Sequence, residues 1–72
     1  MFKTKIQLVG FSDVNKFVSI VSKLDGDIKL TDGHNYCVNA RSLLGCLATV
    51  EWDELFCESD NDIYSHISEF AE

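Results

Sequence analysis

The hydrophobic period changes within residues 36–45, and this change constrains the fold more than any other feature of the chain. Tyr36, Val38 and Ala40 alternate with a cysteine and an asparagine, which is the period of a half-buried strand. The leucines that follow Ser42 form the compact apolar pattern of a helix. A serine just before a helix can accept a hydrogen bond from a free N–H group of the first turn. We therefore expect a strand that passes directly into a helix capped by Ser42.

Alternating apolar residues also predict the other strands. The even positions of residues 2–8 are expected to face the core, beginning with Phe2. Residues 28–30 open a second strand, and the turn residues 32–35 join it to the strand described above as a hairpin with a loop of about four residues. The fourth strand, residues 54–58, is apolar on both faces, as a central position in a sheet requires.

Apolar residues at spacings of three and four predict two further helices. The first carries its apolar stripe over residues 14–24, with Ser12 and Asp13 as candidate N-caps. Gly26 is expected to end this helix in the left-handed backbone conformation. The last helix lies within residues 59–70, where four polar capping residues precede an apolar stripe.

Length and charge limit the function. The 72 residues, of which 46% are hydrophobic, are enough for one domain spanning residues 1–72. A core of this size is marginal, so we expect a monomer or a weak homodimer. Twelve acidic and six basic residues give a net charge of −6, which disfavours nucleic acid and anionic membranes as partners and favours either solubility or a basic protein partner. The longest apolar run is too short to span a membrane.

The three cysteines, Cys37, Cys46 and Cys57, lack metal-ligand spacing. They form no CxxC pair and have no histidine at zinc-ligand spacing, so we expect neither a metal nor another cofactor. An odd cysteine count without an N-terminal leader indicates reduced thiols and a cytoplasmic protein.

The predicted elements follow the order β-α-β-β-α-β-α, which favours an α+β fold with a four-stranded antiparallel sheet and three helices on one face. The chain resembles the HPr phosphocarriers of the bacterial sugar phosphotransferase system, which have this order and an open-faced β-sandwich fold. The resemblance rests on Phe17-Val18, on Asp27-Ile28 and on residues 39–44. The last of these is similar to the alanine, basic residue, serine and bulky apolar residue around the family's regulatory serine.

The resemblance ends at the family's catalytic motif, a histidine at the start of the first helix followed by arginine and proline. The corresponding residues 10–14 contain none of the three, and Asp13 adds negative charge where a phosphoryl group would need neutralising. His34 lies in the predicted hairpin turn and His66 on the last helix. We therefore expect a regulatory or protein-interaction domain that is not an enzyme and has no catalytic residues.

The resemblance implies that Ser42 is a regulatory, phosphorylatable residue, with a kinase or a regulator as the protein partner. The residues expected to bind the partner are Arg41, Ser42, Leu43 and Leu47, and Leu43 is expected to be the exposed leucine because it follows the cap. The simpler alternative for Ser42 is a helix cap alone. Other functional alternatives are a degenerate phosphocarrier and an assembly module that uses the open sheet face. Trp52 is expected to close the edge of the core, with a partner contact as the alternative.

Overall fold

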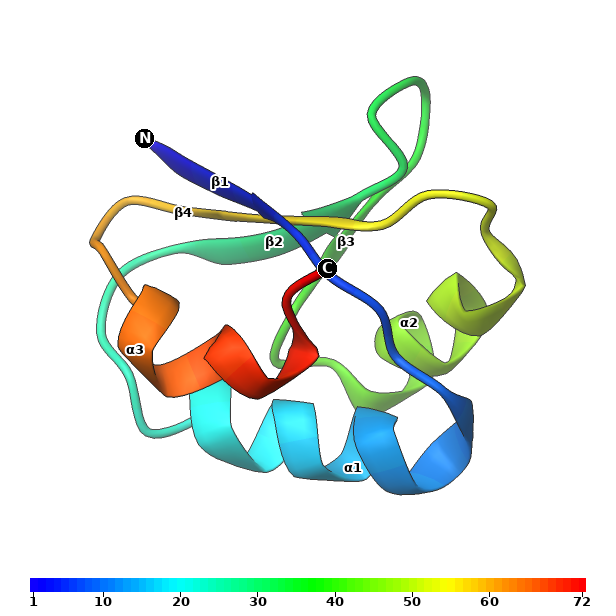
Figure 1. Cartoon of the computed structure of the whole chain (residues 1–72), viewed down its shortest axis with the longest axis horizontal. Coiled ribbons are helices and arrows are strands. Elements are labelled where there is room, and N and C mark those ends of the chain that lie inside the picture. The colour runs from blue at the N-terminus through cyan, green and yellow to red at the C-terminus, as the bar shows by residue number, and fades with distance from the viewer.

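One antiparallel sheet, covered on one face by helices, makes up the chain (Figure 1). The structure is a computed structural model that describes all 72 residues. The expected order of strands and helices and the α+β class with an open sheet are confirmed. The elements are β1 (Phe2–Lys5), α1 (Gly10–Val21), β2 (Ile28–Thr31), β3 (Cys37–Asn39), α2 (Leu43–Ala48), β4 (Phe56–Ser59) and α3 (Tyr64–Ile67), with 3₁₀ turns η1 (Thr49–Glu51) and η2 (Ser68–Phe70).

The strands lie in the order β1-β4-β2-β3, and every neighbouring pair is antiparallel. Cys57 of β4 is paired with Thr4 on one side and with Leu30 on the other, so the predicted central position of the fourth strand is confirmed. The predicted hairpin joins β2 and β3, with five residues between the paired Thr31 and Cys37. The hairpin leaves β3 as an edge of the sheet.

Buried side chains form a single cluster between the sheet and the helices. The predicted helical stripes supply much of it, and Phe17 of α1 contacts Phe70 edge to face with ring centroids 5.5 Å apart. Full burial of such a side chain contributes about 1.5–3 kcal/mol. The cluster contains 14 residues: Ile6, Leu8, Val14, Phe17, Val21, Ile28, Leu30, Ala40, Cys46, Leu55, Cys57, Ile63, Ile67 and Phe70.

The predicted start of α1 is wrong. The helix begins at Gly10, and neither Ser12 nor Asp13 is its N-cap. Asp13 instead lies inside the first turn, where its carboxylate accepts a hydrogen bond of 2.9 Å from the N–H group of Val9. Gly10 has a φ of +73°, a conformation open mainly to glycine, so the chain turns into the helix earlier than the side-chain pattern indicates.

Two other expectations need correction. Phe2 is 47% exposed although its position alternates inward, because it pairs with Ser59 at the end of the sheet where the N-terminus projects away from the helices (Figure 1). The predicted last helix is divided into α3 and η2. Its start is supported by Asp62, whose carboxylate accepts a hydrogen bond of 3.2 Å from the N–H group of Tyr64.

Candidate functional site

Ser42 lies where β3 passes into α2, and the predicted cap is confirmed. Its Oγ accepts a hydrogen bond of 3.1 Å from the N–H group of Gly45, and its backbone is extended. The N–H group of Ser42 in turn donates to the carbonyl oxygen of Asn39 at 3.0 Å. The residue is exposed, so its hydroxyl combines a structural role with access to solvent.

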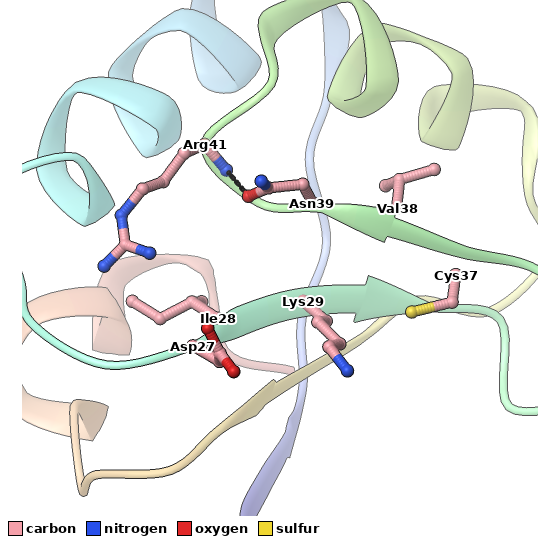
Figure 2. Close-up of a pocket in the computed structure, with 7 residues that line it drawn as sticks. All are labelled: Asp27, Ile28, Lys29, Cys37, Val38, Asn39 and Arg41. Carbon is pink, nitrogen blue, oxygen red and sulfur yellow. Dashed lines mark hydrogen bonds between the residues drawn. The ribbon is translucent and has the colours of Figure 1, made fainter.

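Arg41 is directed toward α1 and not toward α2 (Figure 2). Its Nε donates a hydrogen bond of 3.2 Å to the carbonyl oxygen of Val21, and its Nη2 donates to that of Leu24. The Val21 carbonyl lies at the C-terminal end of α1 and that of Leu24 in the turn that follows, and a cation at this end of a helix also interacts favourably with the helix dipole. The guanidinium group is therefore occupied at the end of α1, although Arg41 adjoins Ser42 in the sequence.

The leucines of α2 differ in exposure. Leu44 is 81% exposed and Leu43 only 37%, while Leu47 is half-buried against the core. Leu43 is therefore exposed, as expected, but the expectation that it is the more exposed of the leucines is wrong, because Leu44 is more exposed. Cys46 and Leu47 face the core, while Leu43, three positions before Cys46, lies at the edge of this face and is partly exposed. Leu44 lies outside that face and presents its side chain to solvent.

A shallow hollow of about 180 Å³ lies beside Arg41, between the start of β2 and β3 (Figure 2). Asn39 shapes this turn, because its Oδ1 accepts a hydrogen bond of 2.8 Å from the N–H group of Arg41. The lining contains no histidine and no second carboxylate to pair with Asp27, so it offers no acid–base pair. Seven residues line the hollow: Asp27, Ile28, Lys29, Cys37, Val38, Asn39 and Arg41.

All three cysteines are free, and only Cys37 is exposed. Burial raises the pKa of the Cys46 thiol to about 11. Burial, with smaller contributions from Cys46 and Glu58, raises the pKa of the Cys57 thiol to about 12. These two thiols are therefore protonated at neutral pH and are poor nucleophiles and metal ligands. No group of three or more His, Cys, Asp or Glu side chains could hold a metal ion.

Neither histidine lies at the start of α1. His34 is exposed in the hairpin loop, and His66 is exposed on α3. The residue that α1 presents in its first turn is Phe11, which is exposed and carries no group for phosphoryl transfer. The chemistry of the HPr catalytic motif has no counterpart at this position.

Residue patterns do not predict a second hollow, which Tyr36 and Trp52 line together with polar residues. The two rings stack on each other although 16 positions separate them in the sequence, with 6.0 Å between their centroids. Trp52 also packs against the core, as expected, but the sequence pattern does not predict its contact with Tyr36. The only available signals were a single tryptophan and a concentration of acidic residues at 51–54.

No helix of the structure combines the length and the apolar character needed to cross a membrane. Comparisons of the chain with protein-family models, with curated proteins and with solved structures gave no match.

Proposed function

We propose that this chain is a regulatory protein-interaction domain of the HPr type, without phosphohistidine carrier activity. Its partner binds the Ser42 surface, which consists of Ser42, Leu43 and Leu44, with Arg41 and Leu47 supporting it from the adjoining turn and the inner face of α2. The observation that carries the proposal is the 81% exposure of Leu44 next to an exposed serine cap. Burying a leucine contributes about 1.5–3 kcal/mol, so a partner that covers Leu44 gains affinity from this side chain.

Phosphorylation of Ser42 by a kinase is the regulatory step of this proposal. A phosphate at the start of α2 would be near backbone N–H groups that lack helical partners, and it would add about −1.5 to −2 charges beside Leu44. Arg41 would not neutralise this charge while its guanidinium group is bonded to Val21 and Leu24. The phosphate would therefore remain available for direct contact with a partner.

The alternative is a degenerate phosphocarrier of the sugar phosphotransferase system. It requires transfer of a phosphoryl group from phosphoenolpyruvate, through the general enzyme of that system, to a histidine of this chain. The absence of histidine from the first turn of α1 argues against this transfer. Incubation with the general enzyme and labelled phosphoenolpyruvate should leave the protein unlabelled, and acid-labile label on His34 or His66 would support the alternative.

The partner surface is tested by quantitative capture from a lysate of the source cell. Tagged wild type, Leu44→Glu, Ser42→Asp and Tyr64→Glu are compared, the last being a matched control because Tyr64 is also an exposed apolar residue, on α3. We expect Leu44→Glu to reduce recovery of a wild-type partner at least tenfold, Ser42→Asp to change it at least fivefold, and Tyr64→Glu to leave it within twofold. Circular dichroism checks that each variant is folded.

Equal recovery by wild type, Leu44→Glu and Ser42→Asp would contradict the proposal. If the partner were then lost with changes at Cys37 or Asn39, the assembly alternative that uses the open sheet face would be favoured. Both of these residues are exposed on that face, in the edge strand β3.

A further inference from the structure

A hollow of about 260 Å³ lies between the hairpin loop that joins β2 to β3 and the segment that precedes β4. Both segments extend from the same end of the sheet, above and to the right of α2 in Figure 1. The hollow is separate from the Ser42 surface, because it is lined by none of the residues that define that surface. Seven residues line it: Asp32, His34, Tyr36, Glu51, Trp52, Asp53 and Glu54.

Two aromatic rings form one wall of this hollow. Tyr36 and Trp52 are stacked with 25° between the ring planes and 6.0 Å between the centroids. Trp52 is held in place because it packs against the hydrophobic core, while Tyr36 is 63% exposed. An exposed aromatic face attracts a cation through the negative charge density above the ring.

The remaining wall is strongly acidic. Four of the seven lining residues are carboxylates, and no lysine or arginine is among the seven. Only Glu54 has a cationic partner, the ammonium group of Lys5 at 3.5 Å. Asp32, Glu51 and Asp53 take part in no ion pair.

Asp32 also fixes the shape of the loop. Its Oδ1 accepts hydrogen bonds from the N–H groups of His34, Asn35 and Tyr36 at 2.8–3.1 Å. These bonds, first among them the one from His34, hold the pKa of the Asp32 carboxyl below its usual value. The loop that positions Tyr36 is therefore built around a carboxylate that stays ionised.

We propose that this hollow binds an arginine side chain of a basic protein partner. A planar guanidinium group can lie flat on an aromatic ring while its N–H groups donate to nearby carboxylates, which a compact ammonium group does less well. The rings are already in stacking contact, so the guanidinium group lies against the exposed face of the pair and not between the rings. The hollow is also smaller than the roughly 300–1,000 Å³ of typical small-molecule sites, which suits a single side chain.

The charge of the whole chain supports the same class of partner. A net charge of −6 attracts a basic partner over a longer range than the contacts themselves, and this attraction weakens as salt is added. The site does not depend on the function proposed for the Ser42 surface. Its test can therefore succeed or fail independently.

Trp52 supplies the measurement, because it is the only tryptophan of the chain. The full chain is titrated with an arginine tetrapeptide amide while the fluorescence of Trp52 is recorded at low salt. We expect a saturable change, at least threefold weaker binding of the lysine tetrapeptide amide, and no change with a glutamate tetrapeptide. Absence of a saturable change with the arginine peptide, or equal affinity for the arginine and lysine peptides, would overturn the proposal.

Matched variants distinguish specific binding in the hollow from non-specific electrostatic attraction. Tyr36→Leu should weaken binding of the arginine peptide at least fivefold, and Tyr64→Leu, which removes an exposed tyrosine on α3, should leave it within twofold. Asp53→Asn should weaken binding of the arginine peptide at least threefold. Asp25→Asn removes the same charge outside the hollow, and the fold-change in affinity that it causes should be less than half of that caused by Asp53→Asn. Equal effects of the two tyrosine variants would show that the ring of Tyr36 is not part of the site, and equal effects of the two aspartate variants would show attraction by overall charge alone. Either result would overturn the proposal.

Discussion

At the scale of single residues, Ser42 and Ser12 show how the same side chain can have different roles. Both precede an apolar stripe in the sequence, yet only the hydroxyl of Ser42 accepts a hydrogen bond from a helix start. Ser12 lies inside α1, which begins at Gly10. A cap depends on backbone geometry at one position, which residue type alone does not determine.

This difference predicts the stability of two matched variants. Ser42→Ala should lower the free energy of unfolding by about 1 kcal/mol, because the N–H group of Gly45 loses its acceptor. Ser42→Asp should restore most of the loss, since aspartate also caps helices well. Ser12→Ala should stay within about 0.5 kcal/mol of wild type. Urea denaturation followed by Trp52 fluorescence measures all three, and a larger loss for Ser12→Ala than for Ser42→Ala would refute the assignment of the caps.

At the scale of elements, the hairpin between β2 and β3 is stabilised by hydrogen bonds within its own loop. One oxygen of Asp32 accepts three backbone N–H groups, and Gly33 has a φ of +83° that only glycine adopts easily. An added Cβ on Gly33 would lie 3.0 Å from the ring of Phe56, so the loop also packs closely on β4. These contacts fix Tyr36 at the end of the loop.

Removal of the Asp32 carboxylate should therefore loosen this loop while the sheet remains. In Asp32→Ala, the amides of His34, Asn35 and Tyr36 should exchange with solvent at least tenfold faster, because each loses its acceptor. Hydrogen exchange measured by NMR tests this, with Asp25→Ala as the control. Unchanged exchange at all three amides would show that the loop is held by other contacts.

The same loop should respond to acid in the wild type. The pKa of Asp32 is lowered in the folded chain, so its contribution to stability is present above the unfolded pKa and is lost as the pH falls through the folded value. Protection of the three amides should therefore persist at a pH where an ordinary aspartate is already partly protonated. Loss of protection at the ordinary aspartate pKa would contradict this expectation.

At the scale of the whole molecule, we expect two buried thiols to make the fold sensitive to alkali. The ordinary pKa of a thiol is near 9.0, and folding raises that of Cys46 to about 11 and that of Cys57 to about 12. The stability that they contribute is fully present below the unfolded pKa and is lost as the pH rises through the folded values. By about pH 10 the expected loss is about 1 kcal/mol for each thiol.

Urea denaturation at about pH 8 and about pH 10 measures this loss. Lysines and tyrosines also titrate in this range, so the comparison is made with the double variant Cys46→Ala/Cys57→Ala. At about pH 8 the variant should be less stable than the wild type because of its cavities. Between the two pH values, however, its free energy of unfolding should fall by about 2 kcal/mol less than that of the wild type. Equal losses in the variant and the wild type would show that the buried thiols do not cause the sensitivity.

Features that depend on hydrophobic period and on local backbone geometry could be predicted from the order of residues alone. The change of period across residues 36–45 located β3, α2 and the Ser42 cap, because the three lie within one short stretch. The stripes of α1 and of the last helix identified most of their buried residues. Gly26 adopts the expected left-handed conformation with a φ of +85°, but the predicted helix end is wrong, because α1 already ends at Val21 with Ser22 as its C-cap. The central place of β4 followed from apolar residues on both of its faces.

Contacts between groups that are distant in the sequence could not be predicted in this way. The guanidinium group of Arg41 bonds to carbonyl groups 17 and 20 positions away because β3 ends beside the end of α1. Tyr36 meets Trp52 because the hairpin loop and the segment before β4 extend from the same end of the sheet. Residue types and spacings do not predict such contacts, since the contacts depend on how the elements pack together. Because of this packing, the guanidinium group of Arg41 binds the end of α1 and the turn after it, and an acidic, aromatic hollow forms elsewhere on the molecule.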